Sequence, residues 1–299
     1  MLQIVPKSYK TFRFSSNQRP QMSVSSGDYL LFETQDAHNS TVDLSNPWKD
    51  VSFPELDQDS GNPVTGLVSI KNAQVGKYLK VKILQILPDP IGILPLRSYM
   101  GIMRNVIQER LARVVKYDDG KIWVSEGLAL PARPMVGTIG VAPESGEIPT
   151  ITAGSHGGNM DDNSITIGSE VFFTIRRNGA LLGLGDVHAA MGDGEFTCGG
   201  VDICAQVLVK VEVIDRVFPT ENPVVIKDGW VITHGFGKDY SEASCIAAEE
   251  MAKLLVQQLR IQTYEAVLLM AARGDLGLCQ ACLCNSSATG VRMAFPIIW

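Results

Sequence analysis

Residues 152–204 constrain the fold of this chain more than any other stretch. Two apolar runs typical of strands lie within it, separated by turns rich in glycine. Glycine lets the backbone turn where a Cβ would clash, so polar groups from separate turns can come close together. The polar residues of this stretch include His156, Asn159, Asp161, Asp162, Asp186, His188, Asp193 and Glu195. The pattern predicts a β-rich fold with one concentrated polar site.

Length and composition indicate two domains, or one large β domain with an appendage. The chain has 299 residues, of which 45% are hydrophobic and 19% charged, and its 28 glycines and 15 prolines favour short strands joined by turns. We expect a mainly β protein, with a sandwich or barrel-like body over residues 1–217. Prolines 219 and 223 then interrupt the periodicity. Residues 218–299 are expected to form a small α/β or α+β domain, with helices over 241–260 and 263–272 that begin at Ser241 and Thr263.

Charge and cysteine content bear on the partners. The net charge is −6 without a block of Lys or Arg, which argues against nucleic-acid binding and favours a small ligand. The six cysteines all lie in the last third, and we interpret 279-x-x-282-x-284 as part of the core rather than a thiolate metal site. There is no basic and apolar leader and no apolar run near 20 residues. We therefore expect a cytoplasmic protein without a membrane span.

An Asp-x-His pattern occurs twice, each time after an apolar run. Asp36 and His38 follow the strand predicted over 29–34, and Asp186 and His188 follow the run 180–184. Side chains alternate along a strand, so each pair would lie on one face if its strand continued. Carboxylate and imidazole together suit zinc and similar divalent ions. The alternative is that each Asp only orients a His or caps a turn.

Two further patterns give predictions of secondary structure. Apolar residues over 99–116 recur at helical spacing, which predicts a helix or a partly helical lid. Residues 68–86 alternate between apolar and polar, which predicts two strands around residues 72–76. The second of these strands should end at Pro88-Asp89-Pro90.

Familiar catalytic motifs are missing from the sequence. It contains no G-x-S-x-G nucleophile elbow, no P-loop and no GxGxxG. What remains is carboxylates with imidazoles on glycine-rich turns. Such a set can hold a divalent ion that activates water for hydrolysis of a small carbonyl compound, with a spare carboxylate to move the proton. The alternative is a structural site whose acids bind calcium or cap turns.

Two long segments resemble signature segments of the acetamidase/formamidase family. They are HGGNMD over residues 156–161 and GDVHAAMGDGE over 185–195, with further agreement at ETQD over 33–36, GVAP over 140–143 and GVRM over 290–293. The resemblance implies hydrolysis of a short amide such as formamide or acetamide to the acid and ammonia, by a homodimer or larger homo-oligomer. The matching positions are Asp36, Asn159, Asp161, Asp186, His188, Asp193 and Glu195.

The resemblance and the residue chemistry together give a hypothesis for the site. Asp36, Asp161 and His188 would hold a divalent metal, with zinc, manganese and calcium all compatible. Glu195, Asn159 and Asp193 would be the catalytic group. Asn159 would hold the amide oxygen or orient a carboxylate, and Glu195 would carry a proton from water to the leaving nitrogen. The roles of His38, His156 and Asp186 stay open.

Two alternatives belong to other classes. One is a protein of the same fold that binds a small molecule or metal without catalysis. The other is an amidase that uses Cys198 as its nucleophile.

Overall fold

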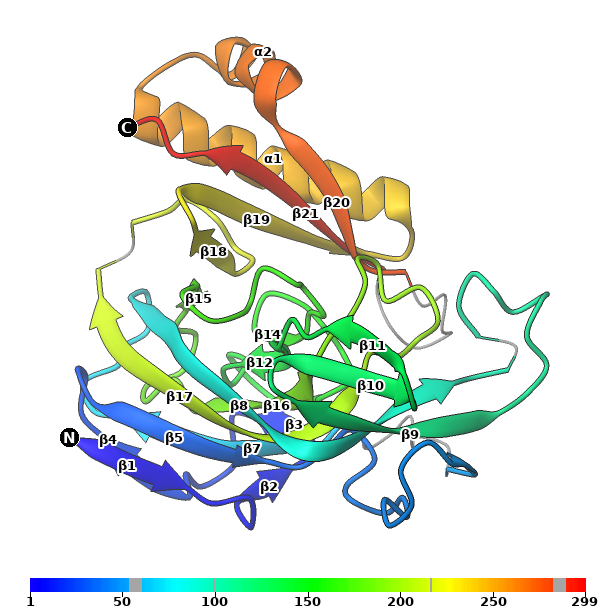
Figure 1. Cartoon of the computed structure of the whole chain (residues 1–299). Helices are drawn as coiled ribbons and strands as arrows, with labels where there is room; N and C mark the ends of the chain where they lie inside the picture. The colour runs from blue at the N-terminus through cyan, green and yellow to red at the C-terminus, as the bar shows by residue number, and fades with distance from the viewer. Residues whose placement is uncertain (54–60, 99, 216, 282–288) are drawn as a thin grey trace.

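The computed structural model describes residues 1–53, 61–98, 100–215, 217–281 and 289–299. Within them strands dominate, and the two helices both lie after residue 239 (Figure 1). The strands before residue 215 are β1 (Leu2–Val5), β2 (Lys10–Thr11), β3 (Arg13–Ser15), β4 (Met22–Val24), β5 (Tyr29–Thr34), β6 (Asp50–Val51), β7 (Val64–Ile70), β8 (Tyr78–Leu96), β9 (Leu111–Asp118), β10 (Lys121–Ser125), β11 (Leu128–Pro131), β12 (Met135–Gly140), β13 (Glu147–Pro149), β14 (Gly157–Asn159), β15 (Glu170–Thr174), β16 (Leu182–His188) and β17 (Asp202–Ile214). The later elements are β18 (Val224–Lys227), β19 (Trp230–Gly237), α1 (Tyr240–Leu259), α2 (Thr263–Arg273), β20 (Asp275–Gln280) and β21 (Thr289–Pro296). The predicted mainly β class with a C-terminal α/β part is confirmed.

The long strand β8 organises the body. One of its edges pairs with β17 from Tyr78↔Ile214 to Ile93↔Asp202. Along its other edge, the first residues pair with β15 and the last with β9. The resulting sheet is curved and is not closed into a barrel (Figure 1).

A second run of strands brings the polar segments together. β12 pairs with β14 on one edge and β16 on the other, so Thr138 lies opposite both Asn159 and Gly185. β16 also pairs with β7 and meets β17 at His188↔Asp202. Segments far apart in the chain thereby end near one another.

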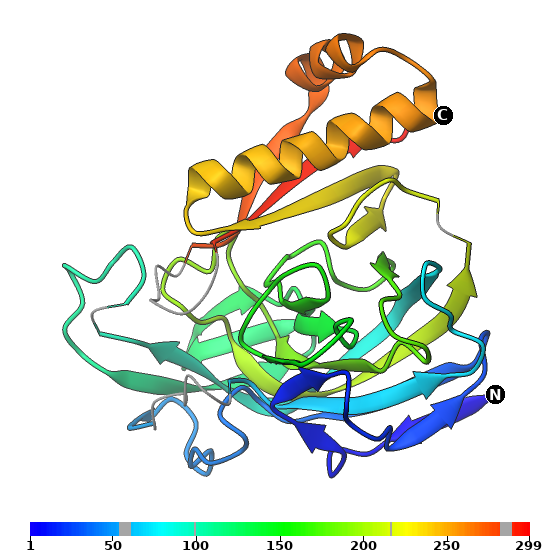
Figure 2. The ribbon, with the colours of Figure 1, turned by 180° about the vertical axis from the view of Figure 1, so that it is seen from behind.

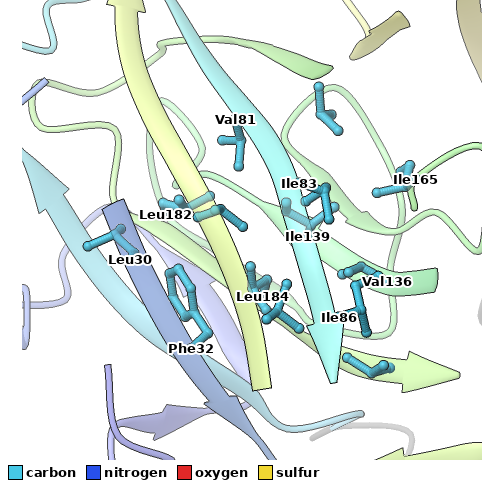
Figure 3. Packing of buried hydrophobic residues seen from close by; sticks show 14 of the residues in the cluster. Leu30, Phe32, Val81, Ile83, Ile86, Val136, Ile139, Ile165, Leu182 and Leu184 are labelled. Carbon is cyan, nitrogen blue, oxygen red and sulfur yellow. The ribbon is translucent and has the colours of Figure 1, made fainter. Parts of the chain in front are cut away.

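Apolar side chains from many strands of the body form the main core. Figure 3 shows Leu30 and Phe32 of β5, three residues of β8, two of β12 and two of β16 packed together. Their alternation along each strand leaves the other faces for solvent or for the polar site. Burial of this cluster is the main source of stability for the body.

The C-terminal elements form a layer on one side of the body (Figure 2). β18, β19, β21 and β20 pair in that order, all antiparallel, and β18 also pairs with β15 of the body. Tyr78 and Phe172 of the body belong to the same apolar cluster as Met251 and Leu255 of α1. The expected boundary at residues 217 and 218 falls between β17 and β18 and stays a prediction.

The two helices lie where the periodicity predicts them, but their caps differ. α1 begins after Asp239, whose side chain accepts a hydrogen bond from the Glu242 N–H at 2.9 Å. α2 has a capping box between Gln262 and Glu265. Neither helix, within the described part of the chain, is both long and apolar enough to cross a bilayer.

The helix predicted over 99–116 is wrong. Of the described residues there, 101–106 form turns and Leu111 onwards belongs to β9, which pairs with β8 from Leu96↔Leu111 to Ile91↔Lys116. Val114 and Val115 suit a strand, and pairing with β8 outweighs the helical spacing of the apolar residues.

The predicted strand end at Pro88-Asp89-Pro90 is also wrong, because β8 continues to Leu96. Pro88 pairs with Ala205 at an irregularity between Ile203 and Ala205 in β17. Prolines are tolerated in sheets at such bulges, where a ladder hydrogen bond is already missing.

Candidate active site

Three potential metal ligands converge at the ends of β14 and β16. Asp161 follows β14, and Asp186 and His188 belong to β16. Their potential ligand atoms all lie within 4.8 Å of one another, and all three side chains are buried. Asp161, Asp186 and the nearby Glu195 each have a positive φ, at 45°, 52° and 42°. Such conformations are costly for residues with a Cβ and cluster at functional sites.

Two amide groups hold Asp161. Its Oδ2 accepts hydrogen bonds from Asn159 Nδ2 at 2.7 Å and from Gln280 Nε2 at 2.6 Å. Its Oδ1 has no partner among the described residues. Burial, together with the carboxylates of Glu195 and Asp186, raises the pKa of Asp161 well above its usual value.

Asp186 is held by a second set of donors. Its Oδ2 accepts from Asn62 Nδ2 at 2.6 Å and from Thr138 Oγ1 at 3.2 Å. The same two side chains donate to Asn159 Oδ1, at 2.9 and 2.6 Å. Asn159 therefore orients Asp161 while Asn62 and Thr138 orient Asn159 itself.

His188 lies between two carboxylates. Its Nε2 is 3.4 Å from Asp186 Oδ1 and 3.4 Å from Asp202 Oδ1, whereas its Nδ1 has no partner among the described residues. Burial opposes the charged imidazolium, but the carboxylates outweigh it and raise the pKa of His188 to about 10. Asp202 also contacts His38. The Nε2 atom of His38 is 3.5 Å from Asp202 Oδ2 and 3.3 Å from Arg97 Nη2.

Glu195 reaches this group through Gln280. The loop after β16 carries Glu195, which is 8% exposed, and its Oε2 is 3.4 Å from Gln280 Nε2. The backbone N–H of Ala281 donates to Gly194 O at 2.7 Å, which ties the loop to the end of β20. A fourth carboxylate therefore borders the convergent group.

Asp36 lies apart from the convergent group. β5 ends at Thr34, and Asp36 Oδ1 accepts from the backbone N–H groups of His38 at 2.8 Å and Ser40 at 3.2 Å. This is the turn-capping arrangement named above as the alternative for an Asp-x-His pair.

Three other predicted or open residues also have local roles. Asp193 is 59% exposed and accepts from Arg292 Nη2 at 2.7 Å and Asn163 Nδ2 at 3.0 Å. His156 is buried against Phe14. Cys198 is buried in the Glu195 loop, and its backbone N–H donates to Glu195 O at 2.8 Å.

Cys279 is buried in β20, as the core interpretation expects, and Cys282 and Cys284 lie outside the described residues.

A second group of possible ligands, Asp162, His234 and Cys279, is already satisfied as an ion-pair network. His234 Nε2 is 2.8 Å from Asp162 Oδ2 and its Nδ1 is 2.8 Å from Pro223 O, so both ring nitrogens face acceptors. Arg292 Nη1 lies 3.4 Å from Asp162 Oδ1. Burial raises the pKa of the Cys279 thiol well above its usual value, which disfavours the thiolate a metal requires.

The first group fits a divalent metal. One imidazole and two carboxylates are a ligand set that zinc and manganese accept. Asp161 Oδ1 is buried and lacks a partner among the described residues, which is unusual unless something else binds it. The acids Asp161, Asp186, Asp202 and Glu195 also bring an excess of buried negative charge that a cation would offset.

Fold and site define a β-rich protein with a carboxylate and imidazole centre, and comparisons with known proteins assign its family. The model of the Acetamidase/Formamidase family matches residues 145–272. The structure of a recombinant predicted acetamidase/formamidase from Thermoanaerobacter tengcongensis is 37% identical, with 99% of this chain and 96% of that chain covered and a TM-score of 0.91. An acetamidase from Bacillus halodurans is 30% identical, with 99% and 97% covered and a TM-score of 0.91.

A formamidase from Methylophilus methylotrophus is 32% identical over 108 residues, which span 35% of this chain and 26% of that protein. The match therefore spans about a quarter of that curated relative. Taken together, the comparisons show that the chain belongs to the acetamidase/formamidase family, whose name describes hydrolases of linear amides. The predicted family is confirmed.

Sequence reasoning missed four residues that contact the convergent group. Asn62 lies just before β7, Thr138 is a polar residue inside an apolar strand, Asp202 is the first residue of β17, and Gln280 is the last residue of β20. Only Thr138 gave a signal, because a polar side chain at the centre of a buried strand requires a partner.

Proposed function

We propose that this protein hydrolyses short aliphatic amides such as formamide and acetamide to the carboxylate and ammonia. The observation that carries the proposal is the convergence of Asp161, Asp186 and His188, with Glu195 beside them, in a chain of this family. The two related structures, 37% and 30% identical over nearly the whole chain, support it.

In this proposal Asp161, Asp186 and His188 hold a divalent ion. Asp186 takes the place first given to Asp36, because its contacts lie within the group. When bound, the ion would lower the pKa of a water molecule and polarise the amide carbonyl. Asn159 and Gln280 orient Asp161, and Asn62 and Thr138 orient Asp186, as the supporting residues of metal sites do.

Glu195 has the role of moving the proton. An amine anion is a very poor leaving group, so nitrogen must be protonated as the tetrahedral intermediate collapses. Glu195 would take a proton from the attacking water and deliver it to nitrogen. Asp193 has a supporting role here, because its contacts with Arg292 and Asn163 hold the loop that carries Glu195.

The test is ammonia release from formamide and acetamide by purified protein, before and after dialysis against a chelator. Zinc, manganese and calcium are then added back one at a time. Activity that disappears and returns with one of them supports the metal-dependent route and identifies the ion. Activity that is indifferent to chelation but lost on thiol alkylation would instead favour Cys198 as nucleophile.

A non-catalytic binder gives a different result. Formamide or acetamide would raise its melting temperature without any ammonia appearing. A cytoplasmic location and a homodimer or larger homo-oligomer are also part of the proposal. Light scattering on the purified protein tests the oligomeric state.

A further inference from the structure

Gln280 is placed at the site by an irregularity in its strand. Leu278 pairs with Val291, but Gln280 pairs with Gly290, so Cys279 is an extra residue in β20. Such bulges redirect side chains and are common beside active sites. Gly290 lies opposite the bulge, where a Cβ would be in ordinary van der Waals contact with Cys279 Cβ at 3.4 Å and Gln280 Cβ at 3.7 Å. The Gln280 side chain is 95% buried, since its exposure is 5%.

The contacts of Gln280 fix the orientation of its amide. The Nε2 atom donates to Asp161 Oδ2 at 2.6 Å and lies 3.4 Å from Glu195 Oε2. Asp161 Oδ2 also accepts from Asn159 Nδ2, so this oxygen is an acceptor whatever the protonation of Oδ1. The NH₂ end of Gln280 therefore faces the two acids, and its carbonyl oxygen points elsewhere.

The carbonyl oxygen is left without a donor. Gln280 Oε1 is buried and has no hydrogen-bond partner among the residues described. A buried acceptor that lacks a partner is costly, so such atoms in native proteins are usually met by a ligand or an ordered water. Its side-chain neighbours in the site, Asp161 and Glu195, receive hydrogen bonds from the other end of the same amide.

We infer that Gln280 is a specificity residue of this site, whose Oε1 accepts an N–H of the substrate amide. This inference rests on the proposed function and extends it to the substrate's nitrogen. A primary amide carries two N–H donors, and one of them would donate to the unpaired Gln280 Oε1. The other end of the same Gln280 amide contacts Glu195, the group proposed to protonate that nitrogen. The site thereby selects amides over carbonyl compounds of the same size without N–H.

The test compares acetamide with acetone, which replaces the NH₂ group by a methyl group of similar size. The KM for acetamide is measured from ammonia release, and acetone is titrated as a competitive inhibitor, in wild type and Gln280→Met. Methionine keeps the length of the side chain but removes both polar ends. We expect the KM for acetamide to rise about tenfold, as loss of one buried hydrogen bond allows, while the inhibition constant of acetone does not rise.

The outcomes separate this role from a structural one. If the two constants rise in parallel, Gln280 only positions Asp161 and Glu195, and the inference is overturned. An unchanged KM for acetamide overturns it whatever acetone does. Absence of ammonia release by wild type overturns the proposed function and the inference with it. Gln74→Met on the surface is the matched control, and Gln280→Leu repeats the test if the Met variant does not fold, as judged by circular dichroism.

Discussion

At the scale of single residues, the site depends on close approach of backbone and side chains. Gly137 shows this most clearly, because a Cβ there would lie 2.6 Å from Asp161 Oδ1 and 2.8 Å from Asp186 O. The residue types of the site were predictable from sequence, because Asn159, Asp161, His188 and Glu195 lie on the turns that stood out. That Asp186, rather than Asp36, lies close to Asp161 and His188 was not predictable, because it depends on β5 ending at Thr34 while β16 runs to His188.

We predict that Gly137→Ala lowers amidase activity at least tenfold. The added methyl group must displace the carboxylate of Asp161 or the backbone at Asp186, and a shift of about 1 Å at a catalytic site can cost about a hundredfold. Ammonia release measures the effect. Gly192→Ala is the control, because a Cβ at that position meets no atom within 4 Å. Equal activity of Gly137→Ala and wild type would show that the close approach of Gly137 to Asp161 and Asp186 is not needed for activity.

We predict that Glu195→Gln abolishes turnover and leaves the fold intact. Glutamine keeps the shape of the side chain but cannot carry a proton between water and nitrogen. The loss should be at least about a hundredfold, the usual contribution of a positioned acid or base. It is measured by ammonia release, with circular dichroism and melting temperature as checks on folding. Retained turnover would remove Glu195 from the mechanism.

At the scale of elements, ion pairs fasten the C-terminal layer to the body. Asp162 of the body contacts His234 of β19 and Arg292 of β21, and Arg292 also holds Asp193 in the Glu195 loop. The helices and the β18–β19 hairpin were predictable, because their signals are local. β9 was not predictable, because the apolar residues of 99–116 recur at helical spacing. That spacing hid the pairing of β9 with β8, which decides the structure there.

We predict that Asp162→Asn destabilises the protein by about 3–5 kcal/mol, because it leaves the Arg292 guanidinium and the buried His234 ring without their carboxylate partner. Urea unfolding monitored by circular dichroism measures the free energy. The control is Arg113→Met, which removes a partly exposed ion pair with Asp50 and should cost at most about 1 kcal/mol. Equal losses in the two variants would show that burial does not strengthen the Asp162 network.

At the scale of the whole molecule, the candidate site contains residues from both the body and the C-terminal elements. The body supplies the acids and His188, whereas β20 supplies Gln280 and β21 supplies the arginine that holds the Glu195 loop. The sequence patterns predicted a small α/β segment at the C-terminal end. They did not predict that it contributes to the site, because pairing of β15 with β18 and burial of Gln280 depend on contacts remote in sequence.

We predict that the metal which restores activity also raises the melting temperature. An ion that binds only the folded state at 100 times its Kd stabilises it by about 2.7 kcal/mol. Differential scanning calorimetry with and without that metal measures the shift. Asp161→Asn should lose most of it, and Asp193→Asn, outside the convergent group, should keep it. The same shift in both variants would place the ion elsewhere.

The distance along the chain between Asp161 and Gln280 has a consequence for synthesis. The two residues are 119 positions apart, yet they share a hydrogen bond of 2.6 Å. At a translation rate of about 5–20 residues per second, Gln280 is added roughly 6–24 seconds after Asp161. During that interval the growing polypeptide holds the acids without the strand that completes their surroundings. A ribosome-bound fragment that ends before Gln280 would therefore lack the amide that donates to Asp161 in the folded protein.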